Sequence, residues 1–207
     1  MPQTRTQFPP NLKADIFQSI RYTKANSGEK LSHQTNRIAI ATLFGVIIFI
    51  TKALLPSPIN KMLIGIHALM LALGTLLLKK QGATFVSLIG GVLTALWNVA
   101  FAPFTLFFAL LYGLLVDAFF LLFRIDVAHG EVKATKVVTA MTMSTSLVGF
   151  ASYYVTVHLP SARALMALIP RSLPLEVLIL VMGTISGAVA GYFASLIWNN
   201  HLKNLRL

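Results

Sequence analysis

The chain has 207 residues, of which 56% are hydrophobic and 11% are charged, and its mean hydropathy is +0.76. A soluble domain carries about 25% charged residues, so this composition excludes an ordinary soluble protein and predicts an integral membrane protein. Cysteine is absent, which excludes disulfides and thiolate metal sites. The net charge of +11 is better explained by helix orientation and contact with anionic lipid than by nucleic acid, so no nucleic-acid partner is expected.

The N-terminal residues 1–37 are polar and basic, and we interpret them as a cytoplasmic tail. Leu12, Ile16 and Ile20 are spaced four apart, which is compatible with a helix lying on the inner leaflet. A disordered tail explains the same composition equally well.

Six apolar stretches follow, each near the ~20 residues that cross the hydrocarbon core. Pro56 and Pro58 end the first stretch, and Pro103 lies in the first turn of the fourth, where its missing N–H costs nothing. The stretches are 38–55, 59–78, 82–101, 103–123, 135–159 and 175–198. The sequence thus predicts an all-α integral membrane protein, with a bundle of six transmembrane helices over residues 38–198 and a cytoplasmic tail over 199–207.

The distribution of Lys and Arg predicts the orientation of this bundle. With the N-terminus inside, only Lys52, Lys61, Arg163 and Arg171 of the 17 basic residues fall outside, so 17 − 4 = 13 lie on the inner side. Because cytoplasmic segments carry the excess of Lys and Arg, we expect both termini in the cytoplasm and the protein in the plasma membrane.

Small residues recur at helical spacing on the sixth and first stretches. Gly183, Gly187 and Gly191 lie four residues apart, so a neighbouring helix can approach closely along that face. Packing within the chain is the expected use of this stripe. Ala41 and Gly45 form a shorter stripe, whose pattern alone leaves internal and intermolecular contact open.

Motifs for catalysis are missing from the sequence. It holds no G-x-x-x-x-G-K-[ST] phosphate loop, no H-E-x-x-H and no paired histidine ligands. Of the six acidic residues only Asp117 clearly lies inside a stretch, whereas a metal or phosphotransfer site needs several converging carboxylates. We expect no catalytic residue, no metal site and no cofactor. Asp117 is interpreted as a structural or docking feature, with Arg124 or Lys79 as its expected partner.

Polar and aromatic residues gather toward the predicted outer ends of the helices. Membrane-embedded polar groups are costly and tend to be functional, and small-molecule sites combine apolar and aromatic walls with a few polar groups. The aromatic residues fit an interfacial belt equally well, and Lys52 and Lys61 are better explained by snorkelling to headgroups. His67 lies too deep to snorkel and favours a cavity. The candidate substrate-binding residues are Asn60, His67, Trp97, Asn98, Tyr153, Tyr154, His158 and Glu176.

Three segments resemble a known family of transporter subunits. They are Leu78-Lys79-Lys80-Gln81-Gly82-Ala83, Leu110-Leu111-Tyr112-Gly113-Leu114-Leu115, and Phe119 to Arg124 with its Leu-Phe-Arg ending. Over about residues 38–125 the chain is similar to the YkoE-like S components of energy-coupling factor (ECF) transporters, the thiamine/hydroxymethylpyrimidine type. The remainder shares only helix number and topology with them.

The resemblance implies a substrate-capture subunit that binds a vitamin or vitamin precursor at the outer face. Such a subunit docks on a transmembrane coupling subunit with two ATPases, and these partners bind the ATP that this chain cannot. The resemblance makes Ala41 and Gly45 the docking surface. One departure concerns the acids: residues 82–101 hold none, although a cationic ligand such as thiamine would gain from a carboxylate.

Two other functions remain as alternatives. A non-transporting scaffold subunit of a membrane complex would need the glycine stripes but not the polar cluster. An integral membrane enzyme is the weakest alternative, because converging carboxylates or histidines are missing.

Overall fold

The computed structural model describes residues 34–54, 64–78, 81–125, 130–158 and 173–203. The regular structure in these ranges is helical, and they contain no β-strand. Contacts between Cα atoms divide the chain into two units, 1–39 and 40–207. Residues 34–39 of the first unit form helix, and the packing described below concerns the second unit.

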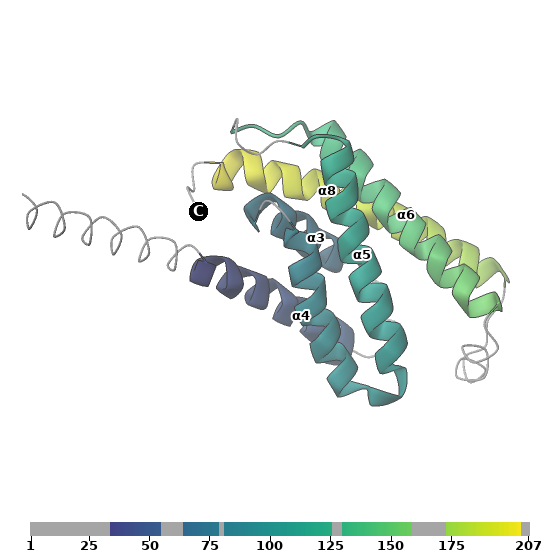
Figure 1. Ribbon diagram of the computed structural model, residues 1–207. Helices are drawn as coiled ribbons and strands as arrows, with labels where there is room; N and C mark the ends of the chain where they lie inside the picture. The colour runs from purple at the N-terminus through teal and green to yellow at the C-terminus, as the bar shows by residue number, and fades with distance from the viewer. Residues whose placement is uncertain (1–33, 55–63, 79–80, 126–129, 159–172, 204–207) are drawn as a thin grey trace, which may run out of the picture. The chain divides into compact units, whose positions relative to one another are not determined.

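The helices correspond to the six predicted stretches, so the all-helical class is confirmed. The first helix occupies residues 34–49 and continues as the π-helix η1. In chain order, the elements are η1 (Ile50–Leu54), α3 (Ile64–Leu78), α4 (Gly82–Trp97), the 3-10 helix η2 (Val99–Phe101), α5 (Ala102–Leu122), α6 (Ala134–His158), α8 (Leu173–Ile197) and the π-helix η3 (Trp198–Leu202) (Figure 1).

Three of the described helices are long and apolar enough to cross a membrane: Gln34–Ala53, Ala102–Leu122 and Leu180–Leu202. Helices α3 and α4 are apolar but shorter, and α6 has 25 residues but is rich in Ser and Thr. These lengths and compositions fit a membrane protein. The number of spans and the cytoplasmic placement of the termini stay predictions.

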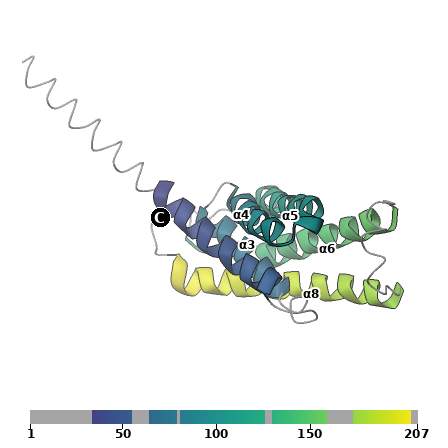
Figure 2. The same cartoon turned by 90° about the horizontal axis from the view of Figure 1, so that it is seen from below.

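Helix α3 lies at the centre of the described packing. It contacts α4, α5, α6 and α8, and the views in Figures 1 and 2 agree on this central place. Its side chains Leu71, Ala72 and Leu76 are fully buried. A helix that is apolar around its whole circumference can be covered by neighbours on every side, and α3, the shortest of the described α-helices with 15 residues, takes this central place.

Helices α4 and α5 form a tight hairpin. A Cβ atom on Gly113 would collide with Ser87 and with the backbone at Ala83, and one on Gly91 would collide with Ala109. The glycines therefore let the two helices approach at backbone distance. The expected corner between them is present: α4 ends at Trp97, and the Asn98 N–H donates to the Thr94 carbonyl (3.1 Å).

The carboxylate of Asp117 on α5 caps the N-terminus of α4. Its Oδ1 accepts from Thr75 Oγ1 (3.0 Å) and the Ala83 N–H (3.1 Å), and its Oδ2 accepts from the Thr84 N–H (2.8 Å) and Thr84 Oγ1 (2.6 Å). The N-cap residue Gln81 has a left-handed backbone, φ 60°, and its side chain makes no cap hydrogen bond. Asp117 thus satisfies helix-end N–H groups that α4 cannot satisfy itself, and its charge suits the positive end of the helix.

Arg124 does not pair with Asp117 and instead ends α5. Its backbone is left-handed, φ 47°; its N–H donates to the Leu121 carbonyl, and the Ile125 N–H donates to the Phe120 carbonyl, both at 3.0 Å. This is the Schellman arrangement, with arginine where glycine is usual. The expected pair with Arg124 is therefore wrong, and the described donors to Asp117 are neutral; Lys79, the other expected partner, lies outside the described residues.

The glycine stripe of α8 faces α6. A Cβ on Gly187 would collide with Thr145 and the Met141 carbonyl, and one on Gly191 would press on the backbone at Val138. Gly183 has more room, with Thr145 at 3.9 Å. Figure 1 shows α6 and α8 side by side along their lengths, and they share an extensive contact.

In the Ala41/Gly45 stripe of the first helix, Gly45 packs against α4. Ala41 and Gly45 are both buried, and a Cβ on Gly45 would lie 2.7 Å from Ile89 Cγ2 and close to the Gly90 backbone. The isolated chain therefore uses this stripe internally, which is the other reading of the pattern. Docking of a partner on the stripe stays a prediction, and it would require the first helix to leave α4.

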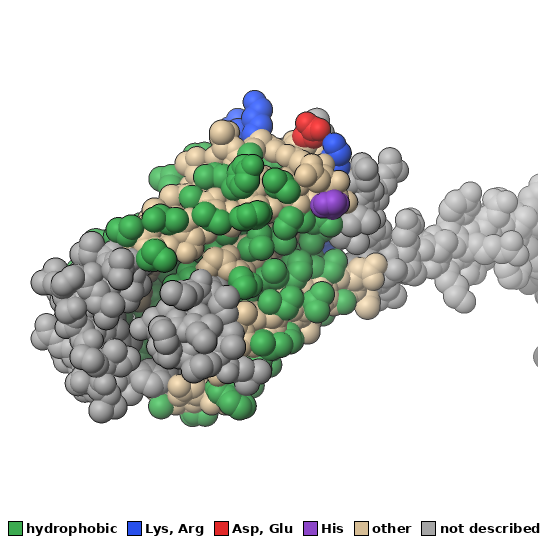
Figure 3. All heavy atoms as spheres, turned by 180° about the vertical axis from the view of Figure 1, so that it is seen from behind, with side chains coloured by type: hydrophobic (Ala, Val, Ile, Leu, Met, Phe, Trp, Pro, Cys, Tyr) green, Lys and Arg blue, Asp and Glu red, His purple; other side chains and the backbone are tan. Residues whose placement is uncertain are grey.

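Charged side chains gather at one end of the second unit (Figure 3). Lys203 pairs with Glu131 at 3.1 Å, and the Asn199 side chain bonds both the N–H and the carbonyl of Val132. Trp198 Nε1 donates to the Gly130 carbonyl at 3.0 Å. These bonds fasten the segment before α6 to the end of α8, while the rest of the visible face is largely apolar.

Candidate functional site

Among the described residues, His67 stands out because one of its buried ring nitrogens lacks a hydrogen-bond partner. It lies in the first turn of α3, and its side chain is 6% exposed. Its Nε2 is buried and has no hydrogen-bond partner among the described residues. A buried polar atom without a partner costs about 1–3 kcal/mol, so a structure retains one where a ligand or water completes it.

The buried hydroxyl groups show the opposite behaviour. Ser144 donates to the Ala140 carbonyl (2.7 Å), and Thr75 donates to Asp117 Oδ1 (3.0 Å). In α6 the same bond to the carbonyl four residues back is made by Thr139, Thr142, Ser144, Thr145 and Ser146. The hydroxyl-rich face of α6 is thus satisfied within its own helix and does not require a cavity.

The ring of Tyr112 on α5 packs against the ring of His67. The two rings meet edge to face, with centroids 5.2 Å apart and planes at 75°, and Tyr112 is buried. Its hydroxyl pairs with Thr145 Oγ1 at 3.3 Å, so this hydroxyl is directed to α6 and not to the imidazole. The ring contact and this hydrogen bond together link α3, α5 and α6.

Lys52 lies in the π-helix η1, and its side chain is half-buried. The sequence favoured snorkelling for Lys52, and Tyr112 was not a candidate at all. An aromatic residue in a run of apolar residues gives no signal of its own, so only its contact with His67 identifies Tyr112.

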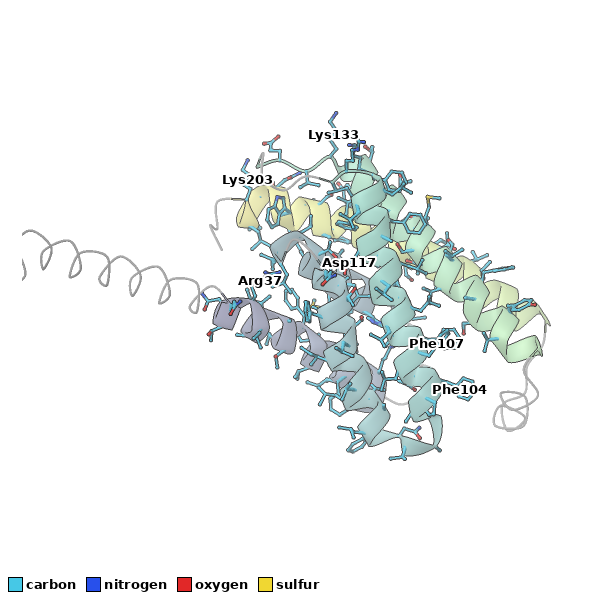
Figure 4. All side chains as sticks on the ribbon, viewed as in Figure 1. Arg37, Phe104, Phe107, Asp117, Lys133 and Lys203 are labelled. Atoms are coloured by element: carbon cyan, nitrogen blue, oxygen red, sulfur yellow. The ribbon has the colours of Figure 1, made fainter. Side chains whose placement is uncertain are left out.

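Asp117 lies on the same helix as Tyr112 but belongs to a different arrangement. Figure 4 shows it turned inward between α3 and α5, whereas Phe104 and Phe107 point away from these helices. Since both of its oxygens are engaged in the cap of α4, Asp117 is a structural group.

A comparison with protein families decides the class of the protein. Residues 37–147, more than half of the chain, match the family described as the permease component of an ABC-type cobalt transport system. The chain belongs to this family. Neither the curated proteins nor the solved structures hold a match to it. Membership makes it a membrane component of an ABC-type transporter, which works in a complex with ATPase partners.

In this permease component, the predicted site residues that the structure describes lie on different helices and differ in exposure. Trp97 is 63% exposed, and its ring meets Phe49 edge to face at 6.2 Å. Asn98 is exposed at the α4–α5 corner, and Tyr154 is 54% exposed on α6. Of these four candidates, His67 alone is buried.

The other candidates of the permease component cannot be placed. Asn60 lies outside the described residues, as do the side chains of Tyr153, His158 and Glu176. Their part in substrate binding stays a prediction.

Proposed function

We propose that this permease component is the substrate-capture (S) component of an ECF-type ABC importer. It binds a vitamin or vitamin precursor of the thiamine/hydroxymethylpyrimidine type and then docks on a transmembrane coupling subunit. Separate ATPase subunits bind and hydrolyse ATP, and the chain itself catalyses no reaction. Family membership supports the transport role, and the absence of a phosphate-binding loop from the sequence fits a division of labour between subunits.

The observation that carries a solute-binding role is the buried, unpartnered Nε2 of His67. A scaffold subunit would gain nothing from leaving this atom unsatisfied between helices, because the cost would reduce its stability. A solute group that bonds Nε2 and packs against Tyr112 would turn the cost into binding energy. The edge-to-face contact of Tyr112 with His67 at 5.2 Å supports this proposal, because an aromatic ring beside a polar group suits an apolar or heteroaromatic solute.

The family description refers to cobalt, and Co²⁺ is therefore the second ligand to consider. Transition metals are held by several imidazole, thiolate or carboxylate groups at once. The chain has no cysteine, and the described residues contain no group of three His, Cys, Asp or Glu that would hold such an ion. The side chains around His67 thus favour an organic solute.

Ligand titration of the detergent-purified chain tests this proposal. The probes are thiamine, hydroxymethylpyrimidine, a panel of other vitamins and Co²⁺, and the readouts are tryptophan fluorescence and calorimetry. We expect saturable binding of one organic compound, weakened at least tenfold in His67→Ala, because one lost hydrogen bond of about 1.4 kcal/mol is worth tenfold. His201→Ala is the matched control, since this histidine is exposed in η3, and its affinity should equal that of the wild type.

Three outcomes would count against the proposal. Binding of Co²⁺ alone would establish a metal-ion permease. Equal loss in both histidine variants would remove His67 from the site. A folded protein that binds no probe, but co-purifies with membrane partners, would establish the scaffold alternative.

A further inference from the structure

We propose that Thr145 on α6 is a positioning residue for the His67 site. It holds the Tyr112 hydroxyl at α6 and thereby keeps His67 Nε2 available to a solute. This inference rests on the proposed function and adds a residue that acts on the same site through Tyr112.

The hydrogen bond between Tyr112 and Thr145 has a defined direction. Thr145 Oγ1 donates its single proton to the Met141 carbonyl at 2.5 Å, so it can only accept from Tyr112. The Tyr112 hydroxyl is therefore the donor across the 3.3 Å that separate the two oxygens. This bond is long, but both side chains are buried, so water does not readily replace it.

Packing against α8 fixes Thr145 in this orientation. A Cβ atom on Gly187 of α8 would collide with Thr145 Oγ1, so the glycine provides the room that this hydroxyl occupies. In that room Thr145 bonds the Met141 carbonyl and accepts from Tyr112. The hydroxyl is thus placed by α8 and α6 and connected to α5.

Without the Thr145 hydroxyl, two unmet polar groups would lie on rings that are in contact. The Tyr112 and His67 rings meet with centroids 5.2 Å apart, and His67 Nε2 has no partner among the described residues. Each buried group without a partner is costly, and a hydroxyl both donates and accepts, so it matches either protonation state of Nε2. Pairing Tyr112 with His67 would satisfy both groups and close Nε2 to a solute.

Nitrogen NMR of the purified full chain, with isotope-labelled histidine, tests the positioning without any ligand. Thr145→Val keeps the side-chain shape and removes the hydroxyl, so we expect the His67 Nε2 resonance to shift as Nε2 pairs with Tyr112. Thr145→Ser keeps the hydroxyl and should keep the wild-type resonance. Thr184→Val is the matched control, because it breaks another interhelical pair of hydroxyls, Thr184 with Ser146 at 3.0 Å.

Calorimetric binding of hydroxymethylpyrimidine tests the consequence for the solute. We expect affinity about fivefold weaker in Thr145→Val, because the solute must displace Tyr112 from Nε2, and wild-type affinity in Thr145→Ser and Thr184→Val. Adding Tyr112→Phe to Thr145→Val should recover most of the affinity, because the aromatic ring stays and the competing hydroxyl is gone. A purely structural role of Thr145 predicts no such recovery.

The outcomes separate this inference from the proposed function. An unchanged His67 resonance or unchanged affinity in Thr145→Val would overturn the inference while a solute-binding subunit stands, and so would a double variant that binds no better than Thr145→Val. If the folded wild type binds no organic probe, the proposed function fails, and the NMR comparison alone decides whether Thr145 holds Tyr112 away from His67. Thr145→Ala provides the same test if Thr145→Val does not fold.

Discussion

Replacing Asp117 should destabilise the N-terminal end of α4 more than replacing any other polar residue of α5. The carboxylate accepts four hydrogen bonds, two of them from the backbone N–H groups of Ala83 and Thr84. In Asp117→Ala both N–H groups lose their partner, and each buried orphan costs about 1–3 kcal/mol. The hydroxyl of Thr75 can turn its one proton to the Leu71 carbonyl, 3.2 Å away, and so adds little. The expected loss in the free energy of unfolding is about 4 kcal/mol.

Asp117→Asn should cost about half as much. The amide oxygen can still accept at the Oδ1 position from Thr75 and the Ala83 N–H, while the NH₂ group faces the Thr84 N–H, donor against donor. One orphaned N–H and the lost charge at a helix N-terminus predict about 2–3 kcal/mol. Thr75→Val removes a donor together with its bond, so it should cost only about 1 kcal/mol.

The assay is a denaturant titration in mixed micelles followed by circular dichroism, with hydrogen exchange of the Ala83 and Thr84 amides as the local readout. The cap would be supported if destabilisation decreases in the order Asp117→Ala, Asp117→Asn, Thr75→Val and if both amides exchange faster in Asp117→Ala. If both Asp117 variants stay within about 0.5 kcal/mol of the wild type, at unchanged exchange, the cap does not hold α4.

The same titration tests four further substitutions. Gly187→Ala should destabilise by about 1–3 kcal/mol because its Cβ collides with the α6 backbone, whereas Gly65→Ala, with its nearest neighbour at 3.8 Å, should gain up to about 1 kcal/mol of helix propensity; equal effects would contradict the packing. Arg124→Gly should stabilise by about 1 kcal/mol, since glycine adopts φ 47° without strain, and a loss would argue against that backbone. Asn199→Ala leaves both backbone groups of Val132 without a partner and should cost about 1–3 kcal/mol, with faster proteolysis near that residue; unchanged cleavage would refute it.

The helices themselves could be predicted from the sequence because each depends on residues that lie close together in the chain. Pro56 marks the end of the first apolar stretch and Pro103 marks the beginning of the fourth, since proline cannot continue a helix interior. The expected start at Gly82 and the start of α4 coincide, and α6 begins one residue before the expected Thr135. The third stretch was expected to continue to Phe101, but α4 stops at Trp97 and a 3-10 turn follows.

The pairing of the helices could not be predicted in the same way. A helix that is apolar on every side, such as α3, has no polar face to reveal which neighbour covers it. The small residues of the first helix show that something approaches closely, but not that the neighbour is Gly90 of α4. The partner of Asp117 was missed for a related reason: charge suggested Arg124, whereas backbone N–H groups at a helix end carry no trace in the sequence.

The polar residues of a membrane sequence differ in whether they can satisfy themselves. Serine and threonine reach the carbonyl four residues back, as Ser144 and Thr142 do in α6, so their number overstates the need for a cavity. In this chain the carboxylate of Asp117 and the imidazole of His67 both rely on groups beyond their own helices. Asp117 finds four donors, and His67 Nε2 finds none among the described residues. We propose that a bound solute supplies the missing partner, so the proposed site centres on His67 and not on the more numerous hydroxyls.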